Sequence, residues 1–227
     1  MCERFTLAAP INVIYDHFKI GTQAPQAVFK PRYNIAPSQD IPVVVKLPDY
    51  PARQLAMMHW GLIPQWTKVK IIDFKLINVQ AETISTKPAH RQVFKKRRCI
   101  IPADGYYEWK NLKGRKQPYY IHYHHGDIFG FAGLWEIWKE GTADCIYSVT
   151  IITTEADAKV GQIHERMPVI LNPEHYDEWL DPENQDTSRL QELLVTDTHD
   201  LEYYPVSQNV NNSKNNGIEL IEKIYFY

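Results

Sequence analysis

The chain has 227 residues, of which 44% are hydrophobic and 23% are charged, and its formal net charge at pH 7 is -2. This composition is typical of a soluble globular protein, and no apolar run is long enough to span a membrane, so we expect a cytoplasmic protein without a membrane partner. The three cysteines form no CxxC pair, which argues against a disulfide framework or a zinc knuckle, and the absence of repeats and linkers favours a single domain over 1–227.

The N-terminus places a cysteine directly behind the initiator methionine. It is not a signal peptide, because no basic region precedes a long apolar one. If Met1 is removed, Cys2 carries two adjacent nucleophiles, a thiol with a pKa of about 8.5 and an α-amine with a pKa of about 8. This pair can condense with an aldehyde, since the amine forms a Schiff base and the thiol then closes a thiazolidine ring. The alternative is a frayed terminus with an incidental cysteine.

The first third of the chain predicts one helix, one rigid loop and two strands. Apolar residues at helical spacing indicate a short helix over 11–18. Prolines fix the stretch 31–39 as an extended loop that contains Pro37 and Ser38. Trp66 follows a Gly-Leu-Ile-Pro turn, where it is either a core side chain or a stacking platform at a cleft. Strands are expected over 41–47 and 55–60.

Charge is distributed unevenly along the chain. Six basic residues and no acidic ones lie between Lys87 and Arg98, in a segment that predicts a helix over 88–98. Ten acidic residues and a single basic one lie between Glu174 and Glu202. A basic stripe on a nearly neutral protein suggests an anionic ligand, although a solvated helix face has the same pattern.

Two polar residues stand out in apolar surroundings. Asn78 follows an apolar pair, which is also typical of a helix cap or turn former. Glu108 lies in a predicted strand over 104–109, on the same face as Tyr106 and flanked by aromatic residues. Such a carboxylate is a candidate for a raised pKa and for proton transfer, and the alternative is a surface glutamate.

The second half of the chain predicts a polar hairpin loop over 110–117 and then further strands. His122 and His124 share a strand face, but no third ligand is evident, so we expect no metal. A pattern like a capping box predicts a short helix over 154–161, after which His164 is suited to proton transfer and Arg166 to phosphate binding. Strands are expected over 119–123, 128–135, 145–153 and 218–221, and helices over 172–180 and 187–194.

These stretches together resemble the SRAP family of abasic site processing proteins. The resemblance rests on several motifs in family order, which are Met1-Cys2-x-Arg4-Phe5, Tyr33-Asn34-Ile35-Ala36-Pro37-Ser38, His59-Trp60-Gly61-Leu62-Ile63-Pro64, Asn78-x-x-Ala81-Glu82-Thr83, Arg98-Cys99-Ile100-Ile101-Pro102-Ala103-Asp104-Gly105-Tyr106-Tyr107-Glu108-Trp109 and His164-Glu165-Arg166-Met167-Pro168. It implies an α+β fold, a single SRAP-type domain with antiparallel strands in barrel-like sheets and flanking helices. It also implies a monomer that works without a cofactor.

The resemblance implies a specific chemistry. Mature Cys2 attacks the ring-opened aldehyde of an abasic site in single-stranded DNA, and the resulting thiazolidine crosslink shields the lesion. Asn78 orients the terminal residue, Glu108 moves protons and His164 acts as acid or base at the sugar ring oxygen. A role in DNA repair and the SOS response, a nucleoid-associated location and removal of Met1 by the protein itself are also implied. The DNA-binding positions implied are Arg4, Pro37, Ser38, Trp66, Gln80, Arg91, Trp109, Thr153 and Arg166.

The chain departs from the family pattern near the reactive terminus. Glu3 stands where the family usually has glycine, and Gln80 stands where it usually has a phosphate-binding arginine. Two other functions are therefore kept open. One is an N-terminal-nucleophile hydrolase in which the Cys2 thiol attacks an amide and its own amine is the base. The other is a non-catalytic single-strand binder whose salt-sensitive affinity is indifferent to Cys2.

Overall fold

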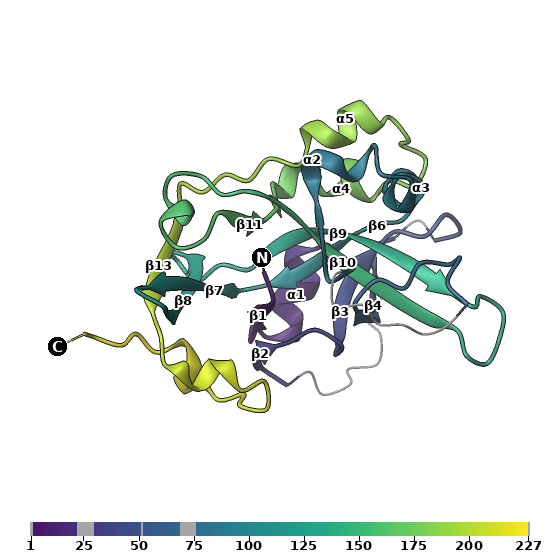
Figure 1. Ribbon diagram of the computed structural model, residues 1–227. Helices are drawn as coiled ribbons and strands as arrows, with labels where there is room; N and C mark the ends of the chain where they lie inside the picture. The colour runs from purple at the N-terminus through teal and green to yellow at the C-terminus, as the bar shows by residue number, and fades with distance from the viewer. Residues whose placement is uncertain (1, 22–29, 51, 69–75, 227) are drawn as a thin grey trace.

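The computed structural model describes residues 2–21, 30–50, 52–68 and 76–226, which form two β-sheets with helices at the periphery (Figure 1). This is the α+β architecture that the family resemblance implied. Met1, whose removal we expect, lies outside the described residues. Within the described ranges, no helix has both the length and the apolar character needed to span a lipid bilayer.

Five strands close on themselves to form a barrel. Each is hydrogen-bonded to two others, in the ring order β3, β4, β10, β9 and β6. All pairings in the ring are antiparallel except that of β4 with β10, which is parallel. The strands are β3 (Asp40–Val45), β4 (Gln54–Trp60), β6 (Arg98–Ala103), β9 (Phe129–Trp138) and β10 (Ile146–Glu155). Three short strands extend this sheet at β10 and β9, namely β5 (Asn78–Gln80), β11 (Arg166–Pro168) and β12 (Ile170–Leu171).

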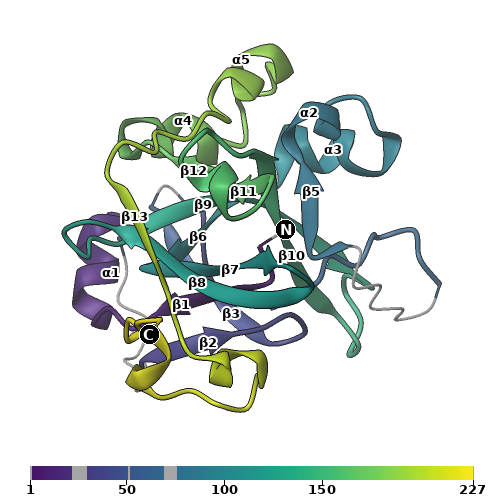
Figure 2. The same cartoon turned by 60° about the vertical axis from the view of Figure 1, so that its left-hand side comes forward.

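A second, open sheet contains the N-terminal strand. Its strand order is β13-β8-β7-β1-β2, so β1 is an inner strand between β7 and β2. Figure 2 shows the start of β1 entering between β7 and β10, that is, between the two sheets. The strands are β1 (Arg4–Leu7), β2 (Arg32–Ile35), β7 (Gly105–Leu112), β8 (Arg115–Tyr123) and β13 (Leu201–Pro205).

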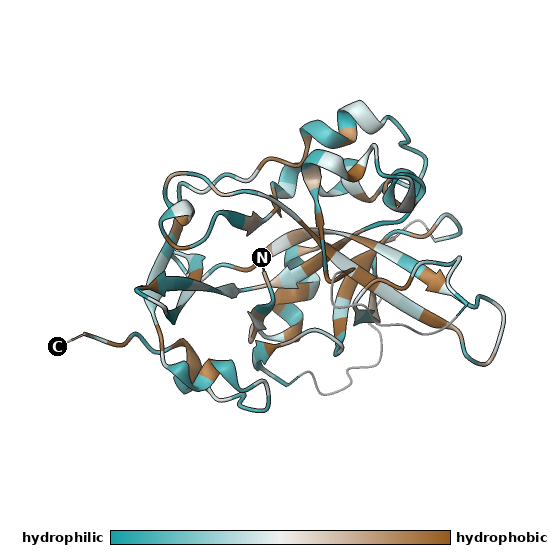
Figure 3. Ribbon diagram, in the orientation of Figure 1, coloured by the Kyte–Doolittle hydropathy of each residue, from teal (hydrophilic) through white to brown (hydrophobic). Residues whose placement is uncertain are grey.

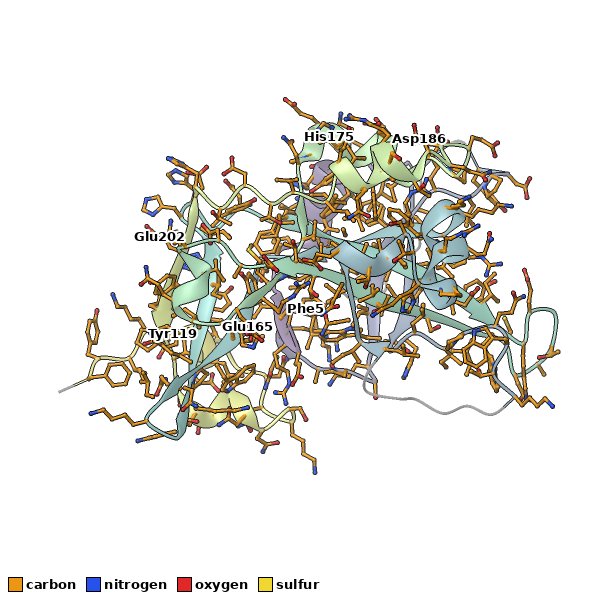
Figure 4. The ribbon with its side chains drawn as sticks, turned by 45° about the horizontal axis from the view of Figure 1, so that its top comes forward. Phe5, Tyr119, Glu165, His175, Asp186 and Glu202 are labelled. Atoms are coloured by element: carbon orange, nitrogen blue, oxygen red, sulfur yellow. The ribbon has the colours of Figure 1, made fainter. Side chains whose placement is uncertain are left out.

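Aromatic packing joins the N-terminal strand to the barrel. Phe5 is fully buried, and its ring lies 5.2 Å from that of Trp60 and 5.8 Å from that of Phe131 in edge-on geometry. Figure 4 labels Phe5 among the side chains between the sheets, and Figure 3 shows hydrophobic residues concentrated in the central strands. Such aromatic pairs contribute beyond the area they bury. The chain is therefore held firmly three residues after Cys2.

Five α-helices and several 3₁₀ turns surround the sheets in the described part of the chain. Helices over 11–18, 88–98, 172–180 and 187–194 were predicted, and each segment contains a helix with somewhat different bounds. The α-helices are α1 (Ile11–His17), α2 (Ala81–Ile84), α3 (Pro88–Lys96), α4 (Tyr176–Leu180) and α5 (Thr187–Glu192). The 3₁₀ turns are η2 (Val160–Gln162), η3 (Pro173–His175), η4 (Gln208–Asn211) and η5 (Ile218–Ile221).

Four predictions of secondary structure were wrong. The stretch 31–39, predicted as an extended loop, contains the strand β2, and only its later part turns toward β3. The helix over 154–161 is absent, because β10 continues to Glu155 within the barrel and only the turn η2 follows, with Asp157 Oδ1 accepting from Val160 N at 2.8 Å. The strand over 218–221 is instead the turn η5. The hairpin loop over 110–117 is far shorter, since β7 and β8 remain paired up to Leu112 and Arg115.

The basic stripe of 87–98 is also smaller than predicted. Arg98 is buried, and its guanidinium donates hydrogen bonds to the carbonyl oxygens of Phe94 at 2.8 Å and Trp179 at 2.6 Å. Arg97 forms an ion pair with Glu136. Arg98 therefore links β6 to α3 and α4, and Arg97 contacts β9. The lysines and Arg91 remain as the more exposed part of the stripe.

Candidate active site

Cys2 is buried at the entrance to β1 and is held by Asn78. The Asn78 side-chain amide donates a hydrogen bond to the carbonyl oxygen of Cys2 at 2.8 Å. Asn78 opens β5, which lies parallel to β10, and its side chain is buried. It is neither a helix cap nor a turn residue. Its other amide atom, Oδ1, has no hydrogen-bond partner among the described residues, which leaves a buried acceptor beside the terminal residue.

Glu108 is a buried carboxylate whose charge acts on Cys2. It is only 2% exposed, so the surface interpretation is wrong. Burial raises the pKa of Glu108 to about 7. Burial also raises the pKa of the Cys2 thiol, and the negative charge of Glu108 raises it further. A carboxyl group that titrates near neutral pH can both accept and return a proton under physiological conditions.

His164 is oriented by the backbone of Arg166. Its Nδ1 lies 3.0 Å from the backbone nitrogen of Arg166 and 3.2 Å from the carbonyl oxygen. The neutral ring accepts from the N–H, and a protonated ring can donate to the carbonyl, so the same residue holds the ring in both states. Burial lowers the pKa of His164, which favours the neutral ring with its proton on Nε2. The environments of Glu108 and His164 thus shift their pKa values in opposite directions.

A small cleft is lined by Glu108 and His164, and by Glu3, the residue next to Cys2. Its volume is about 270 Å³, and its lining residues come from the start of the chain through β1, from β7, β8 and η4, and from the segment after η2. Four residues predicted from the sequence line it. Glu108 and His164 are the predicted proton carriers, and Arg4 and Trp109 are predicted DNA-binding positions. The lining residues are Glu3, Arg4, Glu108, Trp109, Lys116, His164 and Asn211. Among the described residues, no cluster of three or more His, Cys, Asp or Glu side chains is placed to hold a metal ion.

Comparison with known proteins confirms the resemblance read from the motifs. A family model described as "SOS response associated peptidase (SRAP)" matches residues 1–213. The chain belongs to the SRAP family. It is 45% identical to the abasic site processing protein YoqW of Bacillus subtilis over 224 residues. The alignment covers 98% of this chain and 99% of that protein. It is 32% identical to the abasic site processing protein HMCES of Xenopus tropicalis, with 86% of this chain and 67% of that protein covered.

Solved structures show the same fold. A crystal structure of a protein from Bacteroides thetaiotaomicron aligns with a TM-score of 0.84 at 26% identity, covering 99% of this chain and all of that one. A phage-related protein from Bordetella bronchiseptica aligns with a TM-score of 0.74 at 31% identity, covering 91% of this chain and 95% of that one. These matches extend over nearly the whole chain, so the SRAP fold includes both sheets.

In this SRAP chain, Arg166 is engaged by an acidic residue. Its guanidinium binds both carboxylate oxygens of Glu82, at 2.8 and 3.0 Å, and donates to the carbonyl oxygen of Thr153 at 2.7 Å. Thr153 is fully buried in β10. Phosphate binding by Arg166 and Thr153 stays a prediction, and the structure adds that DNA would have to share Arg166 with Glu82.

Arg4 and Trp109 are tied to the C-terminal segment. The guanidinium of Arg4 donates to Asn34 Oδ1 at 3.0 Å and to the carbonyl oxygen of Val210 at 2.8 Å. The indole nitrogen of Trp109 donates to Asn211 Oδ1 at 2.8 Å. Asn34 is itself buried and donates to three carbonyl oxygens of the same segment. The turn η4 thus forms one wall of the cleft, a role that the sequence did not suggest.

The other predicted DNA-binding residues lie outside the cleft lining. Pro37 and Ser38 form the turn between β2 and β3, where the backbone nitrogen of Ser38 donates to Trp60 at 2.8 Å. Trp66 is 73% exposed, which excludes the core interpretation and is compatible with stacking. Gln80 and Arg91 are exposed on β5 and α3. Their contacts with DNA stay predictions.

Sequence reasoning missed Lys116 and Asn211 as cleft residues. Lys116 lies in the stretch predicted as a hairpin loop, and Asn211 lies in an asparagine-rich tail. Neither residue has a local pattern that distinguishes it from a solvent-exposed polar residue.

Proposed function

We propose that this protein captures abasic sites in single-stranded DNA by forming a covalent bond through Cys2 once Met1 has been removed. The observation that carries the proposal is the placement of Cys2, whose carbonyl is held by Asn78 and whose thiol lies within electrostatic range of Glu108. Membership of a family of abasic site processing proteins supports the choice of substrate. The product is a stable protein–DNA crosslink that shields the lesion.

The proposed reaction has two bond-forming steps. The α-amine of Cys2 adds to the aldehyde carbon, and loss of water from the carbinolamine gives a Schiff base. The thiol then adds to the same carbon, its proton passes to the nitrogen, and the thiazolidine ring closes. Glu108 accepts a proton from the attacking amine and returns it to the departing hydroxyl, which a carboxyl group with a pKa of about 7 can do at neutral pH.

Two residues prepare the reactants. Asn78 fixes the carbonyl of Cys2, and its unpartnered Oδ1 is available to accept a hydrogen bond from the new terminal amine. The protonated fraction of His164 supplies the Nε2 proton to the sugar ring oxygen while the anomeric hydroxyl loses its proton to water, which opens the sugar to the aldehyde and leaves the neutral ring held by the backbone N–H of Arg166. The same set of groups gives Cys2 the means to release Met1, in accordance with the word peptidase in the family description.

Intact-mass spectrometry tests this proposal. The protein is measured before and after incubation with a single-stranded oligonucleotide that contains one abasic site. We expect a starting mass that lacks Met1 and, after incubation, a heat-stable increase equal to the oligonucleotide less one water. A protein that lacks Met1 and forms no adduct would contradict the proposal. Cleavage of a peptide or amide substrate under the same conditions would instead support an N-terminal-nucleophile hydrolase.

Glu3 is expected to oppose DNA binding, because its negative charge lies in the cleft where phosphate must approach. Glu3→Gly should tighten binding of abasic single-stranded DNA about 3- to 10-fold at low salt, and the gain should shrink as salt screens the charge. Fluorescence anisotropy at several salt concentrations measures this. Glu3→Gln removes the charge and keeps the side-chain size, so it distinguishes the effect of the charge from the effect of a glycine backbone. Glu202→Gln is the matched control, because it removes an exposed charge outside the cleft. Equal affinity of wild type and both Glu3 variants would show that Glu3 is not an obstacle.

A further inference from the structure

The two basic side chains that line the cleft differ in their partners. The guanidinium of Arg4 is hydrogen-bonded to Asn34 and to two backbone carbonyl groups of the C-terminal segment. The ammonium group of Lys116, in contrast, makes no hydrogen bond or ion pair within the described residues. Of these two cations, Lys116 is therefore the one whose charge remains available to a ligand.

The position of Lys116 is fixed by the same element that fixes Trp109. Gln208 Nε2 donates to the carbonyl oxygen of Lys116 at 2.9 Å, and Asn211 Nδ2 donates to Gln208 Oε1 at 2.6 Å. The other amide atom of Asn211, Oδ1, accepts from the indole of Trp109 at 2.8 Å. A continuous network through η4 thus connects the backbone of Lys116 to the ring of Trp109. Both side chains line the cleft and lie on the same face of the β7–β8 pair, because Lys116 is opposite Asn111 and Pro118 is opposite Trp109.

The charges around the reactive group make this cation more important. Gln80 is uncharged where the family usually has arginine, and Arg166 is paired with Glu82. The cleft itself contains the carboxylates of Glu3 and Glu108. A DNA strand that places its abasic sugar at Cys2 brings a phosphate on each side of that sugar, and each phosphate needs a positive counter-charge.

We propose that Lys116 binds a phosphate next to the abasic sugar while Trp109 stacks against the neighbouring nucleotide. This inference rests on the proposed function, because it takes the strand to enter the cleft that contains Glu108 and His164. An ammonium group on a flexible stem suits a single phosphate contact, and an aromatic face suits a base of any sequence. The contact therefore gives affinity without sequence preference.

Equilibrium binding tests the inference. Binding is measured in the Cys2→Ala background, where no stable crosslink interferes, with a single-stranded oligonucleotide that carries one abasic site. We expect Lys116→Ala to weaken binding about 3- to 10-fold at low salt and to reduce the slope of log K against log[salt] by about 0.7, the value for one contact to a single strand. The matched control is Arg115→Ala. Arg115 precedes Lys116 in β8, faces the other side of the sheet and does not line the cleft, so its replacement should leave the slope unchanged.

A second measurement locates the phosphate. Uncharged methylphosphonate groups are placed one at a time at the phosphates on either side of the abasic sugar. At one position, the methylphosphonate should weaken binding strongly for the protein that retains Lys116 and should have no effect on Lys116→Ala. This is expected because the ammonium group and that phosphate form one interaction. Additive losses at every position would overturn the inference, as would an unchanged salt slope.

The experiments distinguish a wrong role for Lys116 from a wrong covalent mechanism. If Cys2 forms the heat-stable adduct and Lys116→Ala binds DNA like the parent, only the role of Lys116 is wrong. If Lys116 shows the expected slope and the protein without Met1 forms no adduct, the cleft is a single-strand binding site and the covalent mechanism is wrong.

Discussion

Cys2→Ala is expected to abolish the heat-stable adduct with abasic DNA completely. Alanine keeps the α-amine and loses the thiol, so the reaction stops at the Schiff base, which water reverses. Denaturing gel electrophoresis after heating measures the loss. Once methionine aminopeptidase has removed Met1 from the variant, addition of borohydride before heating should still trap its reversible imine, because the α-amine of residue 2 is then free.

Cys145→Ala provides the matched control. Cys145 is also a cysteine that is not in a disulfide bond, and it lies far along the chain, before β10. Its replacement should leave the yield and the rate of crosslinking unchanged. A heat-stable adduct in Cys2→Ala would rule out thiazolidine formation, and its disappearance in Cys145→Ala would identify a different nucleophile.

Glu108→Gln is expected to slow crosslinking about 100-fold or more while DNA affinity changes by less than about twofold. General acid–base groups typically contribute factors of 10² to 10⁴ to a rate. Glutamine has nearly the same shape and cannot transfer a proton, so the loss should fall on the chemical step. Single-turnover crosslinking rates and equilibrium binding are measured in parallel. Equal losses in rate and affinity would contradict a proton-transfer role.

The pH profile provides a second readout for Glu108. Its pKa is raised by burial to about 7, so the carboxylate that accepts a proton becomes abundant as the pH rises through 7. The wild-type rate should therefore increase across this range and should also follow ionisation of the amine at higher pH. Glu108→Gln should lack the step near pH 7 and keep the later increase. A wild-type pH profile without an inflection near pH 7 would show that ionisation of Glu108 does not control the crosslinking rate.

The sequence pointed to the proposed reacting groups more clearly than to their surroundings. Cys2 and Glu108 were singled out on local features, because Cys2 follows the initiator methionine and Glu108 is a carboxylate between aromatic residues. The pairing of Arg166 with Glu82 could not be predicted in this way, because these residues are far apart in the chain and meet only when β11 and α2 pack beside β10. The same holds for Lys116, whose neighbours in the cleft come from other elements.

Errors in secondary structure have a similar origin. The segment 154–161 has local signals for a helix start, but Thr154 and Glu155 pair with Met167 and Arg166 across β10 and β11. Tertiary pairing therefore overrides local propensity at the end of a barrel strand. Likewise, 218–221 has the apolar character of a strand, but in the described part of the chain its backbone forms the 3₁₀ turn η5. Just beyond it, an isolated bridge pairs Lys223 with Val206 in a strand-like way.

The inner position of β1 has a consequence for the fate of a crosslinked protein. The residue proposed to carry the DNA is followed at once by a strand that is paired on both sides and by Phe5, which is fully enclosed. A protease needs an extended, unpaired segment, so it cannot reach this part of the chain by local fraying. Digestion of the folded adduct should begin elsewhere, and release of the lesion from its protein should require global unfolding. Where cleavage outpaces refolding, the lifetime of the crosslinked protein against proteolysis is then set by the unfolding rate of the domain.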